Sequence, residues 1–130
     1  RSIVNEAELL RLLDDRGFVS VDPGQLSVKE QIRAFGTASV IVAPHGAALA
    51  NLIFARPGAA VVELFPQGCL LPDYWRLASS VAGLRYRYVS SLGGPGNRSN
   101  RSNRSRAATI VSDIEVDVAA VAATLSELDG

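Results

Sequence analysis

Two continuous apolar runs constrain this fold most: residues 39–43 (SVIVA) and 60–64 (AVVEL), each followed within two residues by a proline. Runs this short and this apolar are typical of strands that are buried on both faces of a parallel sheet. A third segment, residues 84–89, alternates between apolar and polar residues as a strand does. Helix-period segments lie between these strands, as parallel neighbours require. We therefore expect an α/β, Rossmann-like domain with a mostly parallel sheet and helices on both faces.

Capping residues and helical spacing locate the other elements. Asn5 with Glu8, and later Ser27 with Glu30, have the spacing of capping boxes, and Val4 has the position of a hydrophobic staple. We expect helices that begin after Asn5 and Ser27, at 47–54, at 73–81 and after Asp117, and a further strand at 18–21. The side chains expected to face the core are Leu9, Leu12, Leu13, Val28, Ile32, Phe35, Leu49, Leu52, Ile53, Tyr74, Leu77, Ala78, Val81, Val118, Val121, Ala122, Leu125 and Leu128.

Length and composition narrow the class of protein. The 130 residues suffice for one domain but not for two, so we expect a single domain over 1–130. Thirteen basic and thirteen acidic residues cancel, so the overall charge does not indicate a nucleic-acid partner. One histidine and one cysteine cannot assemble a metal site rich in these residues. No apolar run approaches the ~18 residues that a membrane span needs.

One segment differs from the rest of the chain. Residues 93–106 read GGPGNRSNRSNRSR, in which the triplet Asn-Arg-Ser occurs three times in tandem. The repeat offers no apolar side chain to a core, so we expect a disordered loop at about 93–107.

The stretch around His45 is the most informative for chemistry. A strand ends there, the chain turns at Pro44 and Gly46, and a helix of small residues starts. Free N–H groups at a helix start form an anion site, and Gly46, Ala47 and Ala48 leave room for a phosphate to approach. His45 stands at the edge of this site, where an imidazole can hydrogen-bond a phosphate oxygen. The alternative is a histidine that only caps a turn.

Glu63 is the second candidate, because it interrupts an apolar strand near its carboxyl end. A buried carboxylate without a partner is costly, so Glu63 should reach a partner or a ligand crevice. It could accept hydrogen bonds from the hydroxyls of a ribose. It could equally form a salt bridge to an arginine such as Arg56 or Arg85.

Three further groups of residues are weaker candidates. Ser27, Glu30 and Gln31 lie at a helix start, where a capping box explains the first two without any ligand. The neighbours Tyr74 and Trp75 could stack on a base, but helical spacing favours core packing for Tyr74. Cys69 has no histidine or acid close to it in the sequence, which argues against a catalytic thiol.

Taken together, these motifs resemble glycosyltransferase family 61. The family pattern runs Arg-x-Ile-x-Asn-Glu, Leu-Ser-x-x-Glu-Gln, His-Gly-Ala-Gly-Leu-x-Asn, Pro-Gly-x-x-Val-x-Glu-Leu-Phe-Pro, and Tyr-Trp with a following Gly-x-x-Tyr. The resemblance covers about residues 1–90. The matching residues are Arg1, Ile3, Asn5, Glu6, Leu26, Ser27, Glu30, Gln31, His45, Gly46, Ala47, Leu49, Asn51, Pro57, Gly58, Val61, Glu63, Leu64, Phe65, Pro66, Tyr74, Trp75, Gly83 and Tyr86.

The resemblance implies one half of a GT-B type enzyme, the half that binds the nucleotide-sugar donor. His45, Gly46 and Ala47 would then lie at the donor diphosphate, and Glu63 would lie near the nucleoside. Asn51 would hold the helix or face the sugar. Ala48 stands where the family has a glycine and slightly crowds the phosphate. The residues expected to line the donor cleft are Ser27, Glu30 and Gln31.

The function that the resemblance implies is an inverting transfer of sugar, from a UDP-sugar to a glycan or lipid-linked glycan. No catalytic base is identified, and we expect it in the missing acceptor half. A strand ending in Ser-Arg is also expected before Arg1. No cofactor is identified, although a divalent metal that assists the reaction stays open. The arginine-rich composition, with Lys29 as the only lysine, predicts a bacterial protein. The resemblance implies a cytoplasmic enzyme, or one peripheral at the inner membrane, of surface polysaccharide (capsule) synthesis. It also implies that the domain over 1–130 is incomplete. The alternatives are a non-catalytic nucleotide-binding module and a structural relic of the family.

Overall fold

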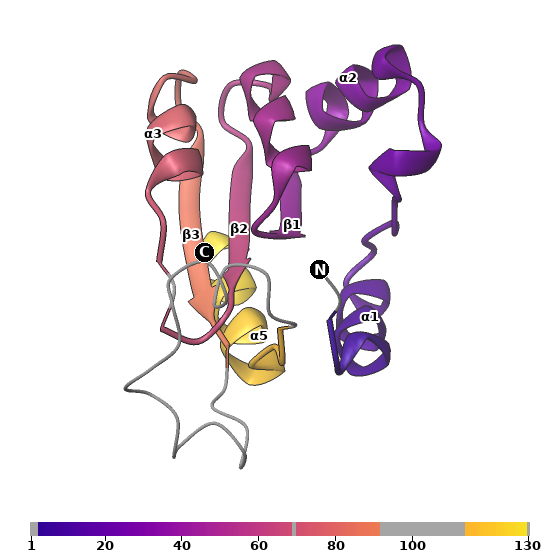
Figure 1. The fold of residues 1–130 in the computed structure, drawn as a ribbon, viewed down its shortest axis with the longest axis vertical. Helices are drawn as coiled ribbons and strands as arrows, with labels where there is room; N and C mark the ends of the chain where they lie inside the picture. Colours follow the sequence, from indigo (N-terminus) through magenta and orange to yellow (C-terminus); the bar gives the residue numbers. More distant parts are fainter. Residues whose placement is uncertain (1–2, 69, 92–113, 130) are drawn as a thin grey trace.

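The computed structural model describes residues 3–68, 70–91 and 114–129 (Figure 1). The expected loop at about 93–107 lies outside these residues, as does Cys69. In chain order the elements are α1 (Glu6–Asp15), the 3₁₀ helix η1 (Pro23–Gln25), α2 (Val28–Thr37), β1 (Val40–Pro44), the 3₁₀ helix η2 (Ala47–Phe54), β2 (Ala60–Phe65), α3 (Asp73–Ser79), β3 (Arg85–Ser90) and α5 (Val118–Asp129).

Three strands form one sheet in the order β1-β2-β3, and both neighbouring pairs are parallel. In the register, Val40 lies beside Ala60, and Ala60 lies beside Arg85. The η2 segment connects β1 to β2, and α3 connects β2 to β3, as parallel neighbours require. The strands predicted at 39–43, 60–64 and 84–89 are therefore confirmed within one residue at each end.

The core is built around β2, all of whose residues are buried. Ala60, Val62 and Leu64 pack with residues of α1 and α5 on one face of the sheet. Val61 packs with residues of α2, η2 and α3 on the other face. Helices thus cover both faces, which confirms the predicted α/β class. Figure 1 shows α1 and α5 near one end of the molecule and α2 near the other.

β1 differs from β2 because it lies at an edge of the described sheet. Each of its residues is only half-buried, whereas β2 has a strand on both sides. The prediction that both apolar runs are buried on two faces is therefore right for β2 and wrong for β1. The physical reason is that burial within a parallel sheet depends on neighbouring strands, which composition does not supply.

Residues 18–21 do not form the predicted strand but connect α1 to η1. Phe18 packs against the core, while Val19 and Val21 are exposed. None of the described strands pairs with this segment. The prediction was wrong because β-branched residues favour a strand only where a partner strand supplies the hydrogen bonds and packing.

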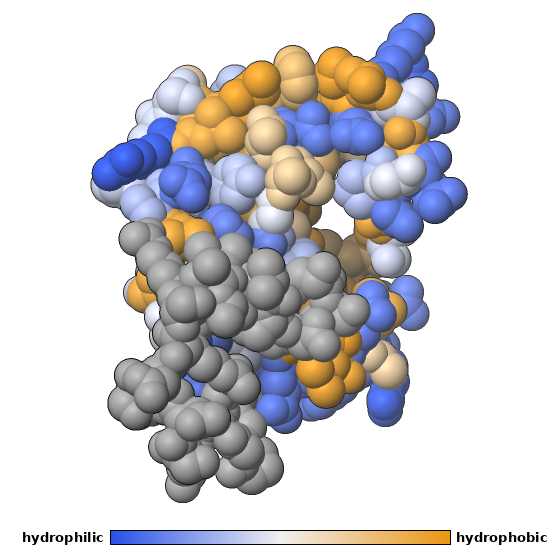
Figure 2. All heavy atoms as spheres, in the orientation of Figure 1, coloured by the Kyte–Doolittle hydropathy of each residue, from blue (hydrophilic) through white to orange (hydrophobic). Residues whose placement is uncertain are grey.

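At α2, the predicted cap is confirmed and the predicted core stripe is not. The Ser27 N–H donates to Glu30 Oε2 at 2.7 Å, and the Glu30 N–H donates to Ser27 Oγ at 3.2 Å. Of the predicted stripe only Phe35 is buried; Val28 and Ile32 are exposed. This helix packs on η2 through Phe35 and leaves its other apolar residues at the surface. Figure 2 shows apolar surface at the end of the molecule where α2 and η2 lie.

The segment after β1 is a 3₁₀ helix rather than an α-helix, and this changes which side chains face inward. Leu49, Leu52 and Ala55 are buried, while Ile53, predicted to face the core, is 54% exposed. A 3₁₀ helix has three residues per turn, so every third side chain shares a face. The α-helical spacing assumed for this segment was therefore wrong at Ile53.

The N-terminus of α1 departs from the prediction as well. Asn5 makes no side-chain cap. Its Oδ1 instead accepts from the Val116 N–H, and its Nδ2 donates to the Val116 carbonyl, both at 2.8 Å. Val4 is exposed and forms no staple, although Leu9 is buried and Leu12 and Leu13 pack against the core as predicted.

The last two helices agree better with their patterns. Asp117 Oδ1 accepts from the Ala120 N–H at 3.0 Å, the predicted cap of α5. Val121, Leu125 and Leu128 of α5 are buried. In α3, the helix ends at Ser79, so Val81 falls outside it. No helix among the described residues is long and apolar enough to cross a membrane.

Candidate functional site

His45 and Glu63, two separate candidates in the sequence, form a direct pair. His45 follows β1 immediately, and its N–H donates to the Leu64 carbonyl at 2.9 Å, which extends the β1–β2 ladder. Glu63 lies two residues before the end of β2, all of whose residues are buried, and it lies beside Ala43 in the register. His45 Nδ1 lies 2.6 Å from Glu63 Oε1. The carboxyl ends of two parallel strands thus bring the imidazole and the carboxylate together.

Glu63 is fully buried, with 0% of its surface exposed, and each of its oxygens has a partner. The second partner is Tyr86 of β3, whose hydroxyl donates to Glu63 Oε2 at 2.5 Å. The predicted arginine partners are not used, since neither Arg56 nor Arg85 forms an ion pair among the described residues. Arg85 instead donates to the Leu128 carbonyl. A buried carboxylate tolerates this position because two donors satisfy it.

The protonation of this cluster follows from its burial. Burial raises the pKa of Glu63, and the hydrogen bonds from Tyr86 and His45 partly oppose that rise. Burial and the neighbouring Glu63 raise the pKa of Tyr86, so that its hydroxyl stays protonated and acts as a donor. An ionised Glu63 therefore accepts from the Tyr86 hydroxyl and from the Nδ1–H of His45. With Nδ1 engaged in this way, Nε2 is the ring nitrogen directed away from Glu63.

Aromatic rings hold the imidazole in place. The His45 ring stacks on Phe65, with ring centroids 5.2 Å apart and planes 23° apart. Tyr74 of α3 lies against it at the same centroid distance, tilted by 56°. Only 10% of the His45 side chain is exposed. The ring is thus held by its hydrogen bond to Glu63 and by these two aromatic contacts.

The turn after His45 leaves the small residues without a structural explanation. Gly46 has an extended backbone, so its conformation does not require glycine. A Cβ there would meet only the Pro44 carbonyl at 3.9 Å, an ordinary contact. The Leu49 N–H donates to the Gly46 carbonyl as η2 begins. A ligand that approaches the backbone remains a physical reason for glycine at this position.

The remaining predicted residues form a second cluster between α2 and η2. Gln31 Nε2 donates to the carbonyls of Pro23 and Leu26, and Gln31 Oε1 accepts from Asn51 Nδ2 at 3.0 Å. Asn51 also donates to the Ala48 carbonyl. Asn51 therefore holds η2 against α2, one of the two roles expected for it.

Ser27 and Glu30 at the start of α2 are occupied by their reciprocal cap. The hydrogen bonds from Ser27 lower the pKa of Glu30. Whether these two side chains line a donor cleft stays a prediction.

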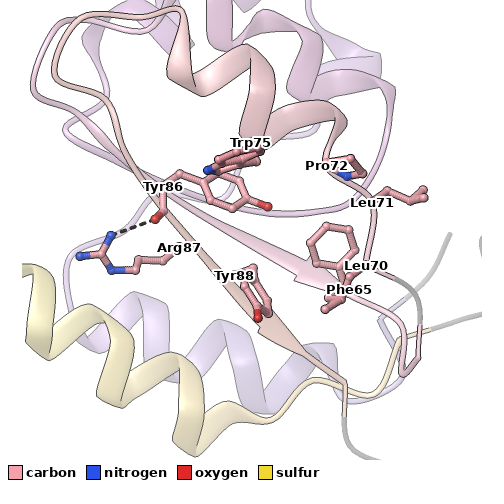
Figure 3. A pocket seen from close by; sticks show the side chains of 8 residues that line it. All are labelled: Phe65, Leu70, Leu71, Pro72, Trp75, Tyr86, Arg87 and Tyr88. Atoms are coloured by element: carbon pink, nitrogen blue, oxygen red, sulfur yellow. Dashed lines mark hydrogen bonds between the residues drawn. The ribbon is translucent and has the colours of Figure 1, made fainter.

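The sequence did not predict that Tyr86 is part of the site or that a pocket lies next to it. Tyr86 lies beside Val61 in the register, two residues from Glu63, so the strand period places both on one face. The alternation of side chains along β2 and β3 was the sequence signal that could have placed Tyr86 on the face of Glu63. Figure 3 shows the pocket, about 480 Å³ in volume, between the 70–72 segment, Trp75 of α3, and Tyr86 and Tyr88 of β3.

No group of three or more His, Cys, Asp or Glu side chains that could hold a metal ion occurs in the described part of the chain.

Comparison with known proteins shows which family this chain is similar to. Residues 1–62 match the family model described as Glycosyltransferase 61. The chain is also similar to protein O-linked-mannose beta-1,4-N-acetylglucosaminyltransferase 2 from Xenopus laevis, with 36% identity over 95 residues. The same protein from Tetraodon nigroviridis is 35% identical over 95 residues, and that from Bos taurus is 34% identical over 96 residues. Each alignment covers 69% of this chain and 16% of the relative, so the chain spans a small part of their length.

Proposed function

Because residues 1–62 of this chain belong to glycosyltransferase family 61, we propose that the protein forms the donor-binding part of an inverting glycosyltransferase. Its donor is a nucleotide-sugar, a UDP-sugar in our proposal, and its acceptor is a glycan. The observation that carries this proposal is the His45–Glu63 pair at the carboxyl ends of β1 and β2. In open parallel sheets this edge is where ligands bind.

In the proposed reaction an acceptor oxygen attacks the anomeric carbon while the bond to the donor phosphate breaks. Negative charge develops on the departing diphosphate, and a donor placed there in advance stabilises it. His45 is suited to this role because, with an N–H on both ring nitrogens, it can donate from Nδ1 to Glu63 and from Nε2 to a phosphate oxygen. Gly46, Ala47 and Ala48 offer backbone with little bulk beside it.

Glu63 acts in this proposal by orienting His45 rather than by touching the nucleoside. Its side chain is fully buried and both oxygens are engaged, which supports the orienting role. Gln31 and Asn51 support the site indirectly, because the hydrogen bond between them joins α2 to η2. The base that removes the acceptor proton is placed in the remainder of the protein, the acceptor half of a GT-B type enzyme.

The relatives are named for transfer of N-acetylglucosamine to O-linked mannose, and they are animal proteins. For this chain we propose the broader class, a saccharide acceptor, free or lipid-linked. The bacterial setting, the cytoplasmic location and the role in surface polysaccharide synthesis stay predictions from composition and resemblance.

The test is calorimetric titration of the protein with UDP, then GDP and CMP, beside the His45→Ala variant. We expect UDP to bind, and His45→Ala to weaken that binding at least about tenfold, which corresponds to about 1.4 kcal/mol. Ile53→Ala is the matched control, because Ile53 lies on the exposed side of η2 and should leave binding unchanged.

A folded protein that binds no nucleotide would contradict the proposal and favour a structural relic of the family. A second assay follows sugar transfer. We expect the 130-residue chain to bind donor without transferring sugar, because the proposed base lies elsewhere. Nucleotide binding without transfer by a polypeptide that also contains the acceptor half would favour the non-catalytic module.

A further inference from the structure

The pocket beside Tyr86 has the size of a small-molecule site. Its volume of about 480 Å³ falls within the range of about 300–1,000 Å³ that ligand pockets occupy. Phe65, Tyr86 and Pro72 contribute to its wall, and Trp75 and Tyr88 lie at its sides (Figure 3). Of these residues, only Trp75 was a candidate for contact with the donor, as a ring that could stack on a base.

Two of the four aromatic residues that line this pocket are open to solvent. Trp75 is 52% exposed and Tyr88 is 53% exposed, although each has a large apolar ring. Trp75 projects from α3 and Tyr88 from β3, so two elements separated in sequence present rings to one pocket. Exposed apolar rings that gather around a concave surface are typical of a binding site.

The polar groups at this pocket are hydrogen-bond donors. The indole N–H of Trp75 and the hydroxyl of Tyr88 can donate. The guanidinium of Arg87 is directed away from these rings and donates to the Tyr86 carbonyl (Figure 3). No carboxylate occurs among the described residues that line the pocket, so a cationic ligand has no counter-charge there. The mainly apolar wall equally disfavours a free phosphate. This chemistry fits a neutral ring with a flat apolar face and hydroxyl or carbonyl acceptors at its edge.

The pocket adjoins the His45 site and shares Phe65 and Tyr86 with it. The Phe65 ring stacks on His45 and also meets the Tyr88 ring edge-on, with the Phe65 and Tyr88 centroids 6.2 Å apart. Phe65 is therefore a wall common to the pocket and the imidazole. A ligand in the pocket lies next to the proposed phosphate position without occupying it.

From this arrangement we propose that the pocket binds one pyranose ring of a saccharide, with its apolar face stacked on Tyr88 and with Trp75 beside it. Its assignment as an acceptor subsite rests on the function proposed above, whereas saccharide binding itself does not. A pyranose has one face lined by C–H groups, which packs on an aromatic ring, and hydroxyls that accept from the donors around the pocket.

Trp75 makes the test direct, because it is the only tryptophan in the chain. Its fluorescence therefore reports on this pocket alone. We would titrate the protein with methyl glucoside, methyl mannoside and N-acetylglucosamine, and separately with uridine. The expected result is a saturable change in Trp75 fluorescence with at least one saccharide and none with uridine.

Two variants of Tyr88 sharpen the result. Tyr88→Ala should weaken saccharide binding at least about fivefold, near the lower end of what removing one stacking ring costs. Tyr88→Phe keeps the ring, so it should retain most of the affinity even if Tyr88→Ala folds poorly. Val28→Ala is the matched control, since Val28 is an exposed apolar residue of α2 that does not line the pocket.

A response to uridine alone would overturn the saccharide assignment, and no saturable response to any saccharide would overturn the site. Equal saccharide affinity in Tyr88→Ala and the unmodified protein would also overturn it. His45→Ala separates this proposal from the proposed function, because it should abolish most UDP binding and leave the saccharide response of Trp75 intact. UDP binding by the unmodified protein together with no saccharide response would support donor binding and contradict the saccharide site.

Discussion

At the residue scale, Glu63 connects the three parts of the candidate site. One buried carboxylate joins the turn after β1, through His45, to β3, through Tyr86. Such a group is stable only while both of its oxygens have donors, because a buried carboxylate that loses one partner keeps the full cost of its lost hydration. His45 and Tyr86 therefore contribute to stability as well as to any chemistry at this edge.

The raised pKa of Glu63 predicts how stability depends on pH. A pKa that is higher in the folded than in the unfolded protein means that folding favours the protonated form. The resulting contribution to stability is fully present below the ordinary glutamate pKa of about 4.3 and is lost as pH rises through the folded-state pKa. We expect Glu63→Gln to remove this dependence, so that the stability of the unmodified protein falls relative to the variant as pH rises through this window.

The measurement is urea unfolding of both proteins at a series of pH values. A ¹³C titration of the Glu63 carboxyl in the folded protein gives the folded-state pKa independently. Parallel stability curves for the two proteins across this window would show that burial does not raise the pKa of Glu63.

At the scale of the elements, η2 shows how a helix type decides which side chains form the core. Its three-residue period buries Leu49, Leu52 and Ala55 and leaves Ile53 exposed. The same helix carries Asn51, whose hydrogen bond to Gln31 joins η2 to α2. The helix that follows the His45 turn is therefore tied to α2 by a side-chain hydrogen bond.

A pair of adjacent variants tests this arrangement. Leu52→Ala should destabilise the protein by about 2–5 kcal/mol, because it removes buried methyl groups and leaves a cavity. Ile53→Ala should change stability by no more than about 0.5 kcal/mol, as surface substitutions usually do. Chemical denaturation of both variants provides the comparison. Equal losses of stability would contradict a 3₁₀ helix here and support the α-helical spacing.

At the scale of the whole molecule, the two ends of the described chain are joined by backbone and side-chain contacts. Ile3 forms an isolated parallel bridge with Ile114, and the Val4 N–H donates to the Ile114 carbonyl at 2.8 Å. Asn5 adds its two hydrogen bonds to Val116, a residue 111 positions away. Helix α1 is therefore held to the rest of the fold by residues from the opposite end of the sequence.

Asn5 is the point at which to test this connection. Asn5→Ala leaves the N–H and carbonyl of the buried Val116 without the partners that they have in the structure. Each buried group left unsatisfied costs about 1–3 kcal/mol, so we expect a loss of at least about 1 kcal/mol in unfolding free energy.

Hydrogen exchange at the Val116 amide should also accelerate in Asn5→Ala. Asn5→Asp is the control, because it keeps the acceptor for the Val116 N–H and should protect that amide better than alanine does. Unchanged exchange in Asn5→Ala would show that the amide pair does not hold the two ends together.

The sequence by itself determined the local features of this protein. The run 60–64 was apolar enough to identify the central strand, and the Ser27–Glu30 spacing identified a cap that both hydrogen bonds confirm. The ordered motifs also identified the family, and they singled out His45 and Glu63 as candidates. These features depend on residues close in sequence, where periodicity and capping geometry fix the outcome.

Only the tertiary structure decided which residues meet. Glu63 is paired with His45 and Tyr86 instead of an arginine. The Asn5 side chain binds Val116 instead of capping α1, and β1 lies at an edge of the described sheet. The tertiary structure also gathered Trp75 and Tyr88 around one pocket. The physical reason is that a buried polar group takes whichever partner the packing of distant elements brings within reach, and no local pattern records that choice.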